Sequence, residues 1–489
     1  MPKATVIGGG FGGMAAALRL RARGHEVSLL DRCSRLGGRA QVFERDGYRH
    51  DAGPTVITAP FLFDELFELF GKRREDYIDF IPLDVWYRFH FHDGREFDYG
   101  GTVDDTLAAI HAIEPDDCQG YSKLLDHSKR IFDIGFTELA DQPFHSVGTM
   151  LKQVPNLARL GCHRTVSQLV SKYLKNEHLR RAFSIHPLLV GGNPFETTCI
   201  YSLIHYLERK WGIYFAKGGT GAIVDALTKL MLETGIEIRT GVTVDSIATQ
   251  GRRATGIELD DGDSFATDLV VSNADPLQLY SKMIKHTSLP WSFRVKRMRM
   301  RQSMGLFVLY FGTSRQYPRI AHHTIWLGER FKDLIHEIFH GSTLPEDFSL
   351  YLHRPTATDT SFAPEGHDSF YVLAPVPNMQ AQIDWQLEGP RLRDRIVAAL
   401  DRTILPGLQQ SIRSDFFMTP KDFSHDYLSS KGSGFSVSPI FSQSAWFRFH
   451  NRSEVLDNLH LVGAGTHPGA GVPGVLCSAK VLDRLPLPA

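Results

Sequence analysis

A glycine-rich turn close to the amino terminus has the residue types and spacing of a dinucleotide site. The turn contains Gly8, Gly10, Phe11, Gly12 and Gly13. It falls between an apolar strand predicted at 5–7 and a helix predicted at 14–23. Glycine at the first position permits a tight turn, at the second lets a pyrophosphate approach the backbone, and at the last lets the helix pack closely on the strand. We therefore expect phosphate groups at the helix amino terminus.

An acidic residue follows the second predicted strand. The strand at 27–30 ends in Asp31, about twenty residues beyond the turn, where a carboxylate accepts hydrogen bonds from ribose hydroxyls. Its charge disfavours the 2′-phosphate of NADP, although the neighbouring Arg32 weakens that argument and is itself a candidate ligand. This pattern predicts a dinucleotide site rather than a purely structural glycine turn. It does not separate FAD from NAD.

Two segments after the second strand favour FAD. They are "RLGGRA" at 35–40 and "YRHDAGPTVIT" at 48–58. A glycine pair beside an arginine lets backbone and guanidinium reach one pyrophosphate, as an extended flavin nucleotide requires. The alternative for this segment is an ordinary surface loop. The candidate ligands here are Gly38, Arg39, Asp51, Gly53, Pro54 and Thr55.

The carboxyl-terminal region supplies a second set of glycines. A strand is predicted at 459–462, and a final helix starts near Gly474 and runs to Lys480, with its amino terminus able to face a flavin ring. The candidate ligands are Gly463, Gly465, Pro473, Gly474 and Val475. We expect the two ends of the chain to meet on one FAD molecule.

Several segments along the whole chain resemble the bacterial carotenoid desaturases of the phytoene desaturase type, which are FAD enzymes related to the amine oxidases. The segments are "TVIGGGFGG", "DAGPTVIT", "HPLLVGGNPF", "WGIYFAKGGTGA", "FSLYLHRP", "LAPVP", "QSAWFRFHNR" and "LVGAGTHPGAGVPGV". The resemblance also implies that the backbone at Val242 lies against the adenine. It implies non-covalent FAD as the cofactor.

The resemblance implies an α/β fold of the amine-oxidase and glutathione-reductase kind. We expect a discontinuous Rossmann-like FAD-binding domain made of residues 1–79, 211–291 and 416–489. Residues 80–210 and 292–415 are then an inserted α+β domain that binds substrate and associates with the membrane. No internal repeat or low-complexity tract interrupts either domain.

The activity implied is the introduction of C=C bonds into phytoene, forming lycopene or neurosporene in carotenoid biosynthesis. Oxygen or a membrane quinone would accept the electrons. A C30 substrate, diapophytoene, remains an alternative, as does a flavin-dependent carotene isomerase. A non-catalytic prenyl-binding escort protein is disfavoured by the intact glycine set and Asp31.

No catalytic residue is evident from the sequence. The histidines, among them His186, His322, His323, His353 and His467, are not spaced as metal ligands, so we expect no metal site. His467 is a weak catalytic candidate because it lies in the glycine run expected at the flavin. A structural role in the loop is favoured for it.

Composition narrows the class of protein. The chain has 489 residues, 42% of them hydrophobic, which is enough for two domains and a large core. A net charge of −1 argues against a nucleic-acid partner. The five cysteines are scattered and form no CxxC pair, as is usual for a reduced cytoplasmic protein. We expect neither a signal peptide nor a transmembrane helix.

Aromatic side chains are frequent in the expected substrate domain, and we predict that some line an apolar tunnel for a polyene. The candidates are Trp86, Tyr87, Phe89, Phe91, Phe195, Tyr201, Trp211, Tyr214, Phe215, Phe307, Tyr310, Phe311, Tyr351 and Tyr371. Burial of apolar area, at about 25 cal/mol per Å², must supply the affinity for such a substrate. The alternative is that most of these rings belong to the ordinary core.

Two amphipathic segments suggest attachment to a lipid surface. One is the helix predicted at 60–71. The other is the segment 146–176, whose basic residues include Lys152, Arg159, Arg164, Lys172 and Lys175. A basic amphipathic helix can lie in the lipid interface. We therefore expect a cytoplasmic protein that binds peripherally to the inner face of the cell membrane; a helix with one solvated face is the alternative.

Overall fold

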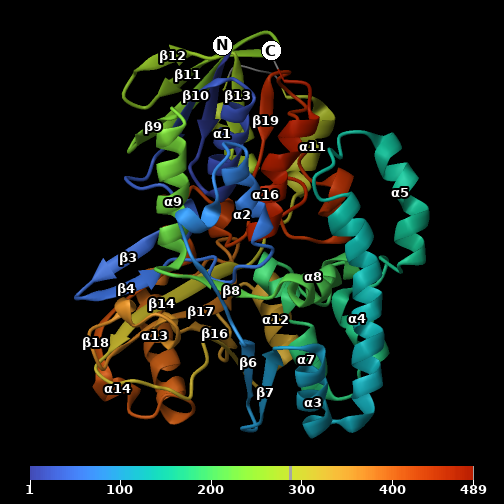
Figure 1. Cartoon of the computed structure of the whole chain (residues 1–489), viewed down its shortest axis with the longest axis vertical. Helices are drawn as coiled ribbons and strands as arrows, with labels where there is room; N and C mark the ends of the chain where they lie inside the picture. Colours follow the sequence, from blue (N-terminus) through green and yellow to red (C-terminus); the bar gives the residue numbers. More distant parts are fainter. Residues whose placement is uncertain (286–288, 488–489) are drawn as a thin grey trace.

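The first layer of the molecule is a five-stranded parallel sheet built from distant parts of the chain (Figure 1). The computed structural model describes residues 1–285 and 289–487. In spatial order the strands are β19 (Leu459–Leu461), β13 (Leu269–Ser272), β1 (Lys3–Ile7), β2 (Glu26–Asp31) and β9 (Glu237–Thr240). Because all pair in parallel, their carboxyl ends meet at one edge, where open α/β sheets bind ligands.

Four helices pack around this sheet. They are α1 (Phe11–Ala22), α2 (Phe61–Glu68), α9 (Gly219–Glu233) and α16 (Val472–Lys480). Helix α1 contacts the other three, and its small residues Ala15, Ala16 and Ala17 are completely buried. The helix ends before Gly24, whose φ of +85° is the left-handed conformation that terminates many helices. Contact of α1 with α16 brings the two ends of the chain together, as Figure 1 shows.

Smaller antiparallel pieces extend from this layer. They are the sheet β10 (Val244–Gln250), β11 (Arg253–Leu259) and β12 (Ser264–Ala266), and the ribbons β3 (Val42–Arg45) with β4 (Tyr48–Asp51) and β5 (Phe80–Pro82) with β8 (Tyr214–Ala216). The β3–β4 ribbon packs on the second sheet, since β4 contacts β17 (Asp368–Val376).

A seven-stranded mixed sheet forms the second layer, at the lower end of Figure 1. In spatial order its strands are β18 (Ile412–Met418), β14 (Gly305–Thr313), β17, β16 (Leu350–His353), β15 (His323–Leu327), β6 (Val85–Phe91) and β7 (Glu96–Gly100). Four further helices belong to this part of the chain, α12 (Phe331–His340), α13 (Trp385–Arg402), α14 (Leu408–Ser411) and α15 (Pro420–Asp426). The boundary expected between 415 and 416 falls inside β18, so residues 416–418 belong to this sheet.

Helices fill most of residues 103–211 along one side of the molecule (Figure 1). They are α3 (Val103–Ile113), α4 (Cys118–Phe132), α5 (Val147–Arg159), α6 (Val166–Tyr173), α7 (Glu177–Phe183) and α8 (Leu203–Trp211). The remaining helices are α10 (Pro276–Gln278) and α11 (Trp291–Arg299). Within residues 1–285 and 289–487, no helix combines the length and apolarity needed to cross a bilayer.

Candidate cofactor and substrate site

A large cavity lies between the two sheets. It encloses about 2480 Å³ of space free of protein atoms, part of it open to solvent. Its wall includes Ile7 and Leu30 at the carboxyl ends of β1 and β2, and Leu306 and Val308 of β14. The cavity therefore connects the edge of the parallel sheet with the face of the second sheet.

The glycine turn forms one end of this cavity. A Cβ atom on Gly13 would lie 1.9 Å from the carbonyl oxygen of Gly8, so only glycine allows α1 to pack this closely on the strand. Gly8 has a φ of +94°. Gly10 precedes α1, and among the described residues no side chain caps the first N–H groups of the helix. Uncapped N–H groups facing a cavity form an anion site, as the spacing predicts.

Asp31 lies on the cavity wall at the end of β2. Its Oδ2 atom accepts a hydrogen bond from the Gly9 N–H at 2.6 Å, and its Oδ1 atom accepts one from the Cys33 N–H at 2.8 Å. Burial raises the pKa of this carboxyl, and the two backbone hydrogen bonds oppose that shift. Each carboxylate oxygen has a second lone pair that can accept from a ribose hydroxyl. The side chain of Arg32 instead donates to the Asp426 carbonyl at 2.8 Å.

Arg39 supplies a half-buried positive charge at the same end. Its Nη2 atom donates to the Ser429 hydroxyl at 2.6 Å, while its buried Nε atom has no hydrogen-bond partner in the described part of the chain. Burial lowers the pKa of the guanidinium, and Asp275 opposes that shift. A buried donor without a partner beside a cavity is a position at which a phosphate or another ligand oxygen can bind.

Asn273 and Asp275 line the cavity, and neither was among the residues predicted from the sequence. Asp275 accepts hydrogen bonds from the hydroxyls of Ser430 (2.7 Å) and Ser436 (2.8 Å). Asn273 and Asp275 follow β13, an interior strand of the parallel sheet. The signal that would have found them is the polar run "SNAD" at the carboxyl end of a strand whose other residues are apolar.

Most of the predicted cofactor residues meet on the cavity wall. These are Gly8, Gly10, Phe11, Gly12, Asp31, Arg32, Gly38, Arg39, Gly53, Pro54, Thr55, Val242, Gly465 and Val475. The others, Gly13, Asp51, Gly463, Pro473 and Gly474, are not on the wall. Gly13 and Gly463 act in backbone packing, since a Cβ on Gly463 would lie 2.2 Å from the Asn273 side chain.

Asp51 is the clearest correction among the cofactor candidates. Its side chain is buried behind the wall, and its Oδ1 atom accepts hydrogen bonds from the backbone N–H and the hydroxyl of Thr220, both at 2.9 Å. These bonds hold the amino-terminal turn of α9. The carboxylate therefore does not face the space that a cofactor would fill.

His467 is also placed away from the cavity. Its ring is buried, its Nε2 atom lies 3.0 Å from the Leu139 carbonyl oxygen, and its ring centroid lies 4.7 Å from that of Phe144. Burial lowers the pKa of His467 to about 4. The geometry gives this histidine a structural role in its loop and removes the reason for treating it as catalytic.

A fully buried arginine supports the carboxyl-terminal loop of the site. Arg448 donates hydrogen bonds to the carbonyl oxygens of Ala464 (2.7 Å), Val437 (3.0 Å) and Thr466 (3.1 Å). Burial lowers the pKa of its guanidinium. The planar guanidinium of Arg448 thus donates to backbone carbonyl oxygens of the loop that carries Gly465.

We expect Arg448→Lys to lower the free energy of unfolding by about 2 kcal/mol, because a single ammonium cannot reach all the carbonyls and each lost hydrogen bond costs about 0.5–1.5 kcal/mol. Chemical denaturation followed by flavin fluorescence and circular dichroism measures it. Arg452→Lys, at an exposed position a few residues away, is the matched control. Equal denaturation midpoints for the two variants would contradict the assigned role.

The rest of the cavity wall is apolar and mainly aliphatic, with several aromatic rings among the aliphatic side chains. Helix α12 contributes one side, with Phe331, Leu334, Ile335 and Ile338. Of the aromatic candidates, Tyr351 and Tyr371 line this cavity, and the others lie elsewhere in the described part of the chain. Trp86, Tyr87, Phe89 and Phe91 are not on the cavity wall and belong to a core cluster that meets the wall at Phe331 and Ile335 of α12.

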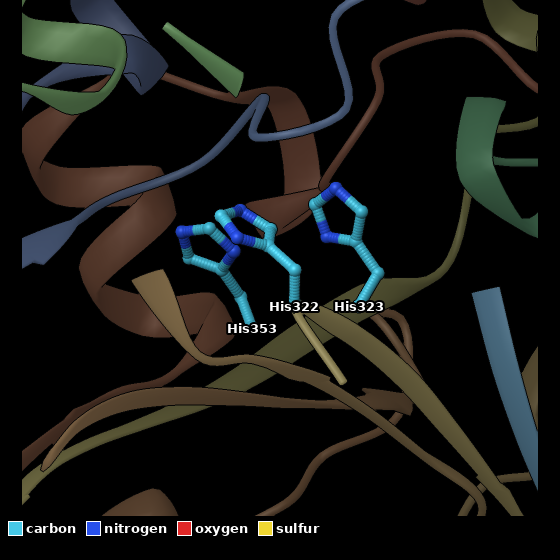
Figure 2. Close-up of side chains that lie close together, drawn as sticks. All are labelled: His322, His323 and His353. Carbon is cyan, nitrogen blue, oxygen red and sulfur yellow. The ribbon is translucent and has the colours of Figure 1, made fainter. Parts of the chain in front are cut away.

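Three of the histidines come together behind the cavity, which the sequence spacing did not predict. His322, His323 and His353 are buried, and their ligand atoms lie within 4.8 Å of one another (Figure 2). Tyr351, which lines the cavity, is 2.7 Å from both the Thr55 hydroxyl and the Nδ1 atom of His323. Burial and the neighbouring His353 lower the pKa of His323 well below its ordinary value.

Comparison with known proteins agrees with this architecture. Residues 11–480 match the family of flavin-containing amine oxidoreductases. Among solved structures, cyclohexylamine oxidase from Brevibacterium oxydans covers 99% of this chain, with 98% of its own length aligned, a TM-score of 0.63 and 16% identity. An oxidoreductase from Methanosarcina mazei has a TM-score of 0.65 and 16% identity, with 99% and 100% covered. These likenesses show the fold.

Sequence relatives are much more similar. A lycopene-forming phytoene desaturase from Pantoea ananas is 46% identical over 100% of this chain and 99% of its own length. A neurosporene-forming phytoene desaturase from Rhodobacter capsulatus is 39% identical over 99% of this chain and 94% of its own. The Rossmann-like fold and the cavity with one polar and one apolar end are consistent with these relatives, which align over nearly their whole length. The chain belongs to the phytoene desaturases within the family of flavin-containing amine oxidoreductases.

Proposed function

We propose that the protein is an FAD-dependent carotenoid desaturase that introduces C=C bonds into phytoene. The observation that carries this proposal is one continuous cavity with two kinds of wall. One end has the uncapped amino terminus of α1, Asp31 and Arg39, and the other has the aliphatic side of α12 and β14. A polyene offers no hydrogen-bonding groups, so an aliphatic wall is the surface that can bind it.

The polar end of the cavity fits a flavin dinucleotide. The N–H groups at the start of α1 and the Arg39 guanidinium would hold the pyrophosphate, Asp31 the ribose, and the backbone near Val242 the adenine. When bound, FAD accepts the hydride that leaves the substrate. The chain's own contribution is to hold the saturated bond beside that group and to keep water away, for which α12 presents no polar side chain to the cavity.

Lycopene and neurosporene are the products we propose, since they are named for the relatives at 46% and 39% identity. A C30 substrate is the second candidate: a diapophytoene desaturase from a Methylomonas species is 31% identical over 98% of this chain. The lower identity over a similar length ranks the C30 substrate below phytoene. Oxygen or a membrane quinone completes the proposed reaction by accepting the electrons.

We expect the purified protein, supplied with FAD and phytoene in liposomes, to form products that are lighter than phytoene by two hydrogens for each step. Under anaerobic conditions the oxidised flavin band should bleach as the first double bond forms, without added nicotinamide. Chromatography with mass detection and absorption spectroscopy measure these two quantities. A product isomeric with phytoene would instead identify a carotene isomerase, and a requirement for stoichiometric NAD would reject the proposed use of flavin.

We also propose that the protein binds peripherally to the inner face of the cell membrane. Two helices expose apolar side chains beside basic ones. Helix α5 exposes Leu151 (64%) and Val154 (47%), and α11 exposes Trp291 (72%) and Met298 (74%). Helix α2, which corresponds to the amphipathic helix predicted at 60–71, is not a candidate for this contact, because it buries Leu62, Phe63, Leu66 and Phe67. A substrate that dissolves only in lipid gives such surfaces a function.

Neutralising the basic residues of segment 146–176 should weaken binding to anionic liposomes, because each such charge contributes on the order of 1 kcal/mol near the surface. The variant replaces Lys152, Arg159, Arg164, Lys172 and Lys175 by glutamine. The matched control replaces five exposed basic residues elsewhere, Arg45, Arg73, Arg252, Arg253 and Lys421. Co-sedimentation at low and high salt measures binding. If the two variants sediment alike, α5 and α6 are not the contact, and Trp291→Ser tests α11.

A further inference from the structure

The histidine cluster behind the cavity brings unpaired ring nitrogens of three buried residues close to one another. In His322, the Nδ1 atom lies 2.7 Å from the Thr358 hydroxyl, and in His323 the Nδ1 atom lies 2.7 Å from the Tyr351 hydroxyl. The Nε2 atoms of both rings are buried and have no hydrogen-bond partner in the described part of the chain. In each ring the Nδ1 atom is therefore held by a hydroxyl group, and the Nε2 atom has no hydrogen-bond partner among the described residues.

The third ring and a carboxylate complete the set. Both ring nitrogens of His353 are buried without a hydrogen-bond partner among the described residues, and so is the Oδ2 atom of Asp51. That oxygen lies 3.4 Å from the Nε2 atom of His353. The other oxygen of Asp51 is held by Thr220. Asp51 therefore repeats the pattern of the histidines, with one atom anchored and one atom unpaired.

Leaving several buried polar atoms unpaired is costly, at about 1–3 kcal/mol for each. One cation can satisfy four of these five atoms, one from each residue, because neutral imidazoles and a carboxylate are its natural ligands, and the second ring nitrogen of His353 then faces away from the ion. In a tetrahedral site with bonds of 2.0–2.1 Å, neighbouring ligand atoms are about 3.4 Å apart. The distance from Asp51 Oδ2 to His353 Nε2 is 3.4 Å, and the ligand atoms of the three histidines lie within 4.8 Å of one another, so small side-chain shifts would complete the site on metal binding.

The geometry points to a divalent-metal site of the zinc class formed by the clustered nitrogens of His322, His323 and His353, to which Asp51, adjacent to His353, adds the fourth ligand. Three nitrogens and one oxygen make a closed, four-coordinate set, which is typical of structural and not catalytic zinc. The hydroxyls of Thr358 and Tyr351 act as the outer partners that orient metal-binding histidines.

The position of the site indicates what the metal would do. Asp51 ends β4 and is followed by residues 52–55, which line the cavity, while His323 and His353 belong to β15 and β16 of the second sheet. A metal bound here would tie the cofactor side of the cavity to the sheet that forms its aliphatic wall. The inference rests on these residues alone and does not require the proposed reaction.

The test uses the full-length protein without a polyhistidine tag, stripped with a chelator and then titrated with Co²⁺ or Zn²⁺. We expect one metal ion per chain, visible absorption bands of tetrahedral Co²⁺, and displacement of Co²⁺ by Zn²⁺. X-ray absorption at the zinc edge should give nitrogen and oxygen neighbours at about 2.0–2.1 Å with imidazole scattering. These measurements need only the wild-type chain, so they remain decisive if a variant does not fold.

Variants assign the ligands. His323→Gln and His353→Gln should weaken binding at least 100-fold, and Thr358→Val, which removes an outer partner, about 10–100-fold. His460→Gln, at a buried histidine of the parallel sheet, is the matched control and should bind as the wild type does. Absence of stoichiometric metal in the wild-type chain would overturn the proposal. So would equal affinity in the cluster and control variants, which would indicate surface histidines only. Flavin content, measured in parallel, separates this outcome from failure of the proposed desaturase function.

Discussion

Gly10→Val should abolish FAD binding while the chain still folds. Gly10 lines the polar end of the cavity and immediately precedes the uncapped amino terminus of α1. A Cβ atom here would lie 3.0 Å from the Asn273 amide nitrogen, and the two methyl groups of valine would extend beyond it into the space where a pyrophosphate approaches the backbone. The φ of Gly10 is −71°, so the backbone itself does not require glycine. The loss should therefore concern the ligand and not the turn.

Flavin absorbance per chain after gel filtration measures the effect, and circular dichroism checks the fold. Gly148→Val, near the start of α5 and far from the cavity, is the matched control, because an added Cβ there meets only the Ser146 hydroxyl at 3.4 Å. We expect full flavin content in the control and none in Gly10→Val. Retained flavin in a folded Gly10→Val protein would show that the turn does not hold the cofactor.

Ile335→Asn should lower kcat/KM for phytoene about 10–100-fold with flavin content unchanged, because burying an amide without a partner costs about 1–3 kcal/mol and 1.4 kcal/mol is tenfold. Ile335 is 3% exposed and lies on the side of α12 that faces the cavity with Leu334 and Ile338. The amide would keep water in the aliphatic wall, and a polyene cannot replace the hydrogen bonds of that water.

Initial rates in liposomes at several phytoene concentrations measure this effect. His336→Asn changes the next residue of the same helix, whose side chain is exposed, and should leave the rate as it is. A thermal midpoint close to that of the wild type excludes unfolding as the cause. If both variants desaturate phytoene at the wild-type rate, the aliphatic wall of α12 does not contact the substrate.

The sequence by itself determined the polar end of the site. Gly8, Gly10 and Gly13 have fixed separations along one strand, turn and helix, so local geometry places them wherever the chain folds. The same holds for Asp31 at the end of the next strand. The carboxyl-terminal glycines were also identified, although the structure divides them, with Gly465 on the wall and Gly463 packed under Asn273.

Only the tertiary structure decided the other half of the cavity and the histidine cluster. The sequence shows which residues are apolar. It does not show which of them face a cavity and which pack inside the core. Composition therefore favoured rings, whereas α12 and β14 provide mainly aliphatic side chains. His353 lies about thirty residues beyond His322 and His323, and Asp51 lies far earlier in the chain. They meet because β16 pairs with β15 in antiparallel register, with His353 opposite His323, and because β4 packs on the same sheet. Strand pairing joins residues that are far apart in the chain. The spacing of residues within one strand therefore does not predict it.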